Sequence, residues 1–183
     1  LSLGRAGDEC IQVPYVSNYS IQDSIFAETV GEHYDRGGML IKYSTAEHPL
    51  DRISVHHNLF TRIGGRMPQI DIDDDIENTA VFHTRLHLEV SSNLYWDVGF
   101  PIDYASQQND GRANPYDYDL NIVSNYYFVR PSYPFGMMFP VGTGDPQLFF
   151  SGNEMNLYPA YSDYFLVNCC NTFQQDHPSN PDD

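Results

Sequence analysis

The segment Leu88-Glu89-Val90-Ser91-Ser92-Asn93-Leu94-Tyr95 decides the fold, because its pattern returns four more times along the chain. Each copy has a short apolar stretch, a small or polar residue, an Asn, and then an apolar or aromatic pair. The other copies lie at residues 20–26, 53–60, 120–127 and 148–155, and Ser24 stands in place of the Asn in the first of them. Self-similarity at a near-constant interval is the sequence signature of a repeat architecture.

The spacing of the copies predicts the kind of repeat. The key positions 24, 58, 93, 125 and 153 are separated by 34, 35, 32 and 28 residues, which is too variable for a rigid helical repeat. An Asn tolerates the left-handed backbone conformation and bonds to its own main chain, so an Asn between two short strands predicts a tight bend. Such Asn side chains, stacked on successive coils, can bond to one another in a ladder. β-Branched and aromatic residues around each Asn favour strands. We therefore predict an all-β protein, a right-handed parallel β-helix (solenoid) of about five coils.

Length and composition set the domain organisation. The 183 residues suit one domain, and 41% hydrophobic and 14% aromatic residues exclude global disorder. We expect residues 1–173 to form the β-helix domain and the polar residues 174–183 to form a tail. Coils stack about 4.8 Å apart, so five coils make a short solenoid. An open solenoid end needs a cap, so we expect a piece of a longer protein.

Charge and sequence patterning exclude several classes of function. The 25 acidic and 9 basic residues give a net charge of -16, which argues against nucleic acid as a partner. No apolar run approaches the roughly 18 to 20 residues of a membrane span, and residues 1–5 do not form a signal segment. Cys10, Cys169 and Cys170 do not make a disulfide framework. We expect a monomer that binds neither nucleic acid nor membrane.

Charge is nevertheless uneven along the chain. Residues 36–70 hold five cations against two acids, and an acidic run follows directly; the cations are Arg36, Lys42, Arg52, Arg62 and Arg66, and the run is Asp71, Asp73, Asp74, Asp75 and Glu77. Together these can receive a carboxylate-bearing polymer and a divalent cation. The alternative is that the acids only solvate a loop.

The copy at residues 53–60, which reads Ile-Ser-Val-His-His-Asn-Leu-Phe, together with the downstream Arg66-Met67-Pro68, resembles the pectate lyase superfamily. It is similar to that family's strand with a His-His-Asn turn and a following Arg-x-Pro. Ser92-Asn93-Leu94-Tyr95 is similar to the family's Asn-Asn-x-Tyr coil, and residues 35–41 to the segment in which the family places a substrate-binding cation. The resemblance covers roughly residues 20–100.

The resemblance implies a secreted polysaccharide lyase that cleaves polygalacturonate (pectate) or a related uronate glycan by β-elimination. Calcium bridges the uronate carboxylate, and an Arg removes the proton at C5. The matching position makes Arg66 the base, with Arg36, Lys42 and Arg62 as substrate-binding cations. A guanidinium has an unperturbed pKa above about 12, so this role requires bound calcium to repel the proton and to acidify C5.

The calcium site implied by the resemblance has three candidate ligands, Asp8, Glu28 and Asp71. The family's calcium carboxylates lie mostly before the His-His-Asn coil, where this chain offers only Asp8, Glu9, Asp23 and Glu28. Asp8 is the first choice because it follows Gly7 at the start of a strand-like run. Asp71 stands where the family often has a second Arg, which inverts the local charge.

Other functions compete with the lyase. One alternative is an inactive β-helical carbohydrate-binding or structural module, or a fragment of a larger surface protein. Another is glycoside hydrolysis, for which Asp73 and Asp75 would share a strand face.

Other side chains have a structural interpretation beside a functional one. His56 and His57 are consecutive on a strand, so we expect them to face opposite sides and to pack. For Trp96, Tyr104, Tyr116 and Tyr118, a sugar-stacking platform competes with packing under loops.

Overall fold

The computed structural model describes residues 1–30, 37–45, 47–74, 85–98, 117–129, 137–138, 147–157, 159–160, 162–163 and 167–168. Within these ranges the regular structure is β-strand, and no α-helix occurs. Every strand pair is parallel. The predictions of an all-β chain and of parallel strands are confirmed. Residues 174–183, the predicted tail, lie outside the described residues.

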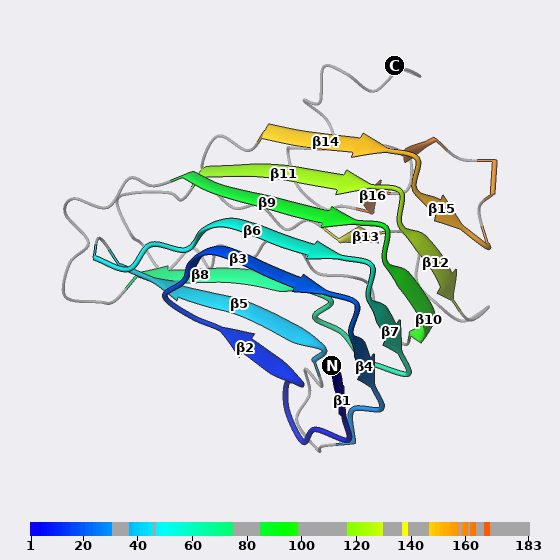
Figure 1. The fold of residues 1–183 in the computed structure, drawn as a ribbon. Helices are drawn as coiled ribbons and strands as arrows, with labels where there is room; N and C mark the ends of the chain where they lie inside the picture. The colour runs from blue at the N-terminus through cyan, green and yellow to red at the C-terminus, as the bar shows by residue number, and fades with distance from the viewer. Residues whose placement is uncertain are drawn as a thin grey trace.

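Three parallel sheets carry most of the strands (Figure 1). Sheet A contains β1 (Ser2–Gly4), β4 (Ile25–Ala27), β7 (Leu59–Thr61), β10 (Leu94–Val98), β12 (Tyr126–Val129) and β15 (Glu154–Met155). Sheet B contains β2 (Ile11–Val13), β5 (Met39–Ser44) and β8 (Gln69–Asp74). Sheet C contains β3 (Ser17–Gln22), β6 (Asp51–His56), β9 (Arg85–Ser91), β11 (Asp117–Val123) and β14 (Gln147–Ser151). Two short strands, β13 (Met137–Met138) and β16 (Val167–Asn168), pair with each other.

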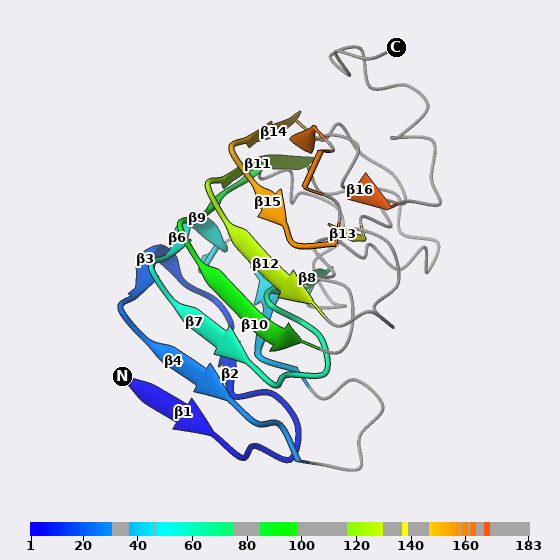
Figure 2. The ribbon, with the colours of Figure 1, turned by 90° about the vertical axis from the view of Figure 1, so that its right-hand side faces the viewer.

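The chain visits the sheets in a repeated order. From β1 to β10 it passes from A to B to C three times and returns to A. Each pass places its strands beside those of the previous pass, so β1, β2 and β3 are the outer strands of their sheets at one end. Figure 2 shows the strands of sheet A stacked from β1 to β15.

Each of the five sequence copies forms a strand in sheet C, a two-residue bend and a strand in sheet A. The second residue of each bend is Ser24, Asn58, Asn93, Asn125 or Asn153. The first residue has the left-handed conformation, with φ between 49° and 69°, and is Asp23, His57, Ser92, Ser124 or Gly152. The predicted tight bend is present, but the left-handed residue is the one before the Asn, and the Asn side chain bonds to the neighbouring copy.

The buried Asn side chains form a continuous ladder, as predicted. Asn58 Nδ2 donates to Asn93 Oδ1 at 3.1 Å, Asn93 Nδ2 to Asn125 Oδ1 at 3.1 Å, and Asn125 Nδ2 to Asn153 Oδ1 at 3.0 Å. Each of these Oδ1 atoms also accepts the backbone N–H of the preceding copy's bend. Asp163 ends the ladder, accepting the N–H of Gly152 and both the N–H and Nδ2 of Asn153. The ladder therefore satisfies buried polar groups that would otherwise oppose folding.

Apolar side chains on the inner faces of the sheets build the core. On sheet A the fully buried rings of Phe26, Phe60, Tyr95 and Tyr127 stack face to face, with centroids 4.7–5.1 Å apart. On sheet C a matching column contains Ile21, Val55, Val90, Ile122 and Phe150. In-register columns let each strand bury its apolar side chains against the next strand.

Candidate functional site

The candidate site lies on the connections that lead from sheet A to sheet B. Three such connections join strands of the described part of the chain, at residues 5–10, 28–38 and 62–68. Backbone hydrogen bonds from Cys10 N to Gly37 O and from Gly38 N to Gly65 O, both 3.0 Å, hold them side by side. Residues 31–36, with the predicted substrate cation Arg36, lie outside the described residues.

Arg66 lies in the third connection and reaches across the second to contact Glu9 in the first. Its guanidinium forms an ion pair with the Glu9 carboxylate, and the two side chains are only 15% and 9% exposed. Gly37 makes room for this reach, because a Cβ there would lie 2.7 Å from Arg66 Cδ and 2.8 Å from Arg66 Cβ. Arg66, the residue predicted to be the base, thus pairs with a carboxylate of the chain itself.

Arg62 and Glu28 are paired with each other. Arg62 Nη1 lies 2.8 Å from Glu28 Oε1, and both side chains are largely exposed. Each follows a strand of sheet A in the left-handed conformation, which places the two residues side by side on neighbouring connections. A predicted substrate cation and a predicted metal ligand therefore neutralise each other.

Lys42 and Asp71 occupy neighbouring positions on β5 and β8 of sheet B. Ile41 precedes Lys42 and is fully buried, so Lys42 points away from the core. Asp71 and Asp73 lie in β8, and their side chains are outside the described part, as is Asp75. Asp8 is exposed beside Glu9.

The described residues, which exclude the side chain of the predicted ligand Asp71, do not by themselves form a calcium site. They contain no group of three His, Cys, Asp or Glu side chains arranged to hold a metal. The carboxylates nearest the predicted position, Glu9 and Glu28, each face an arginine. A cation in contact with a carboxylate opposes the binding of a second cation there.

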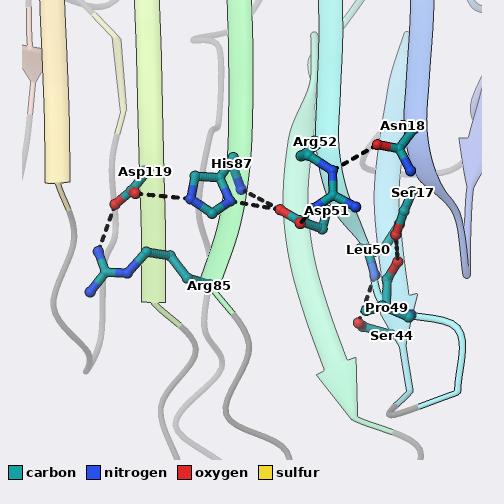
Figure 3. Close-up of polar contacts among 10 residues, drawn as sticks. All are labelled: Ser17, Asn18, Ser44, Pro49, Leu50, Asp51, Arg52, Arg85, His87 and Asp119. Carbon is teal, nitrogen blue, oxygen red and sulfur yellow. Dashed lines mark hydrogen bonds and ion pairs between the residues drawn. The ribbon is translucent and has the colours of Figure 1, made fainter.

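A second polar cluster lies on the outer face of sheet C (Figure 3). The His87 imidazole stands between two carboxylates, with Nδ1 2.8 Å from Asp51 Oδ1 and Nε2 3.3 Å from Asp119 Oδ2. Arg85 Nη1 lies 2.6 Å from Asp119 Oδ1, and Arg52 Nη1 lies 2.9 Å from Asp51 Oδ2. Three neighbouring strands, β6, β9 and β11, are joined by this cluster.

The contacts of the cluster lower the pKa of Asp51. Burial of the Asp51 carboxyl acts to raise its pKa, but hydrogen bonds from the side chain and backbone of His87 and from the backbone of Arg52 outweigh burial. The pKa of Asp51 therefore lies below its ordinary value. A carboxyl group with a lowered pKa is unsuited to act as a general acid. The ion pairs of the cluster tie the three strands together.

His56 and His57 depart from the expectation that they face opposite sides. Their Nδ1 atoms lie 2.8 Å apart, and His56 Nε2 lies 3.2 Å from Ser20 Oγ. The alternation rule fails because His57 is in the bend with φ of 55° and not in the strand.

Trp96 lies on the outer face of sheet A. It is 46% exposed, and its ring stacks on Phe128 with centroids 4.2 Å apart. The ring is thus more open than packing under a loop would leave it. A sugar ring stacks on an aromatic face, and Phe128 already covers one face of Trp96. Tyr104 and Tyr116, and the side chain of Tyr118, are outside the described part.

Cys10, beside Glu9, carries a free thiol. Burial raises the pKa of this thiol, and hydrogen bonds with the backbone of Ala27 and Ala6 offset that only in part. Its thiolate is disfavoured, which lowers the reactivity of Cys10 as a nucleophile.

The sequence missed the Glu9–Arg66 pair and the Asp51–His87–Asp119 cluster. The cluster had a usable signal, since Asp51 and His87 are 36 residues apart and Arg85 and Asp119 are 34 apart, close to the repeat interval. Comparisons with protein families, curated proteins and solved structures give no match to this chain. No helix in the described ranges is long and apolar enough to cross a bilayer.

Proposed function

We propose that the three sheets are the faces of one right-handed parallel β-helix of about five coils. The repeated A-to-B-to-C order, the parallel pairing and the Asn ladder support this proposal. The right-handed sense follows from the strong preference of parallel crossover connections for that hand.

On this fold we propose a polysaccharide lyase that cleaves polygalacturonate or a related uronate polymer, with Arg66 as the base. The observation that carries the proposal is the contact of Arg66 with a carboxylate, at the position where the His-His-Asn motif leads us to expect contact with a uronate. Because Gly37 has no side chain, the Arg66 side chain has room to extend across the second connection.

The reaction is an elimination. Neutral Arg66 takes the C5 proton, the C5–H electron pair forms the C4–C5 double bond, the C4–O bond breaks, and the departing oxygen takes a proton from solvent. Because Glu9 is in contact with the guanidinium, Arg66 has to part from Glu9 before it reaches the C5 proton.

The ultraviolet absorbance of the new double bond tests the proposal. Wild-type protein incubated with polygalacturonate should produce it, and Arg66→Lys should lower the rate by roughly 100-fold to 10,000-fold, the range for removal of a general base. Arg52→Lys, on the outer face of sheet C, is the matched control and should retain the rate. The resemblance implies calcium, so a chelator should also lower the rate. An Arg66→Lys protein with the wild-type rate would remove Arg66 from the mechanism.

A second candidate, a non-catalytic module that binds uronate polymer, is favoured by the same ion pair. A protonated guanidinium binds a carboxylate well but cannot accept a proton. For this function the protein should be retained on immobilised polygalacturonate without any new absorbance. Absence of retention would exclude it.

A further inference from the structure

The Glu9–Arg66 ion pair differs from the other ion pairs of the described residues in two ways: its side chains are less exposed, and it joins two connections that are not adjacent. Arg52 and Arg62 pair with acids while remaining 61% and 63% exposed, and Arg85 is 30% exposed. Arg66 is 15% exposed and its partner 9%. Arg62 and Arg85 bind acids on an adjacent connection or strand, whereas Arg66 passes over Gly37 to a connection two places away.

The geometry makes Glu9 a competitor for the substrate's carboxylate. A guanidinium recognises a carboxylate through its N–H donors, and Glu9 occupies this group already. A uronate that approaches Arg66 has to displace Glu9 or bind beside its negative charge.

We propose that Glu9 is a positioning residue that holds Arg66 in its resting place and thereby lowers the apparent affinity of the protein for uronate. This inference rests on the proposed function. Affinity for a ligand falls in proportion to the fraction of protein in the competent state. Release of Arg66 from Glu9 therefore raises apparent affinity for uronate.

Glu9→Gln is the direct test. It keeps the size of the side chain and removes the charge. We expect roughly tenfold tighter retention on polygalacturonate for Glu9→Gln than for wild type, and a faster elimination. Asp119→Asn, which removes the partner of Arg85 on the outer face of sheet C, is the matched control and should bind as wild type does.

A fully methyl-esterified polymer separates the proposed role from a merely structural one. It presents no free carboxylate to Arg66, so Glu9→Gln and wild type should bind it equally. If Glu9→Gln proves unfolded by circular dichroism, Glu9→Asp replaces it. This variant keeps the charge on a shorter side chain that reaches Arg66 less well, and its affinity for polygalacturonate should also exceed that of wild type.

The outcomes of these experiments distinguish a failure of this inference from a failure of the proposed function on which it rests. Wild-type retention or cleavage with no gain in the Glu9 variant overturns the role of Glu9 and leaves the proposed function in place. A loss on both polymers by a folded variant makes Glu9 purely structural and likewise overturns the inference. Failure of every folded protein to retain or cleave polygalacturonate overturns the proposed function and this inference together.

Discussion

Asn93 shows what a single repeat residue does. Its side chain is buried and makes four hydrogen bonds, accepting from the N–H and Nδ2 of Asn58 and donating to Val55 O and Asn125 Oδ1. We predict that Asn93→Ala lowers the free energy of unfolding by at least about 3 kcal/mol, because it leaves several buried polar groups unpaired. Urea unfolding measures this. Asn121→Ala, at an exposed position of β11, is the control, and an equal loss in both variants would contradict the ladder's role.

The lowered pKa of Asp51 predicts that the stability of the folded protein depends on pH. Its pKa is below the ordinary value of 3.8 in the folded protein, so the folded state favours the ionised carboxyl. Its contribution to stability is fully present above the unfolded pKa and is lost as pH falls through the lower folded pKa. Thermal unfolding at a series of pH values should therefore show stability falling below about pH 4. Asp51→Asn should flatten this fall, and an unchanged curve would contradict the assignment.

At the scale of elements, the connection between sheets A and B depends on Gly37. A methyl group there would meet Arg66 at 2.7 Å, so Gly37→Ala has to displace the Arg66 side chain from Glu9. We predict a loss of about 1–3 kcal/mol in unfolding free energy, the range for overpacking, and altered retention on uronate polymer. Gly7→Ala is the matched control, since an added Cβ at Gly7 meets nothing within 4 Å. Equal stability of the two variants would contradict the packing described.

The same elements show what the sequence could predict. The Asn was visible in the sequence because it recurs in four of the five bends. The left-handed residue before it was missed because Asp, His, Ser and Gly all occupy that place. Sheet B was not recognised either, since no recurrent residue marks its strands.

At the scale of the whole molecule, the repeat interval relates residues that are far apart in sequence. Glu28 and Arg62, like Arg85 and Asp119, are 34 residues apart and pair directly. Such pairs were predictable in principle from complementary charges one repeat apart. The Glu9–Arg66 pair was not, because it spans two connections and depends on the missing side chain of Gly37. The parallel sheets followed from the repeat, while the partner of the proposed base required the structure.

The products formed from polygalacturonate, analysed by mass spectrometry, test the central claim most directly. If Arg66 serves as the base of an elimination, wild-type protein yields oligouronides that carry an unsaturated end, and Arg66→Lys yields none. Saturated products from the wild type would indicate hydrolysis, and an intact polymer would indicate no cleavage; either result would contradict the lyase account.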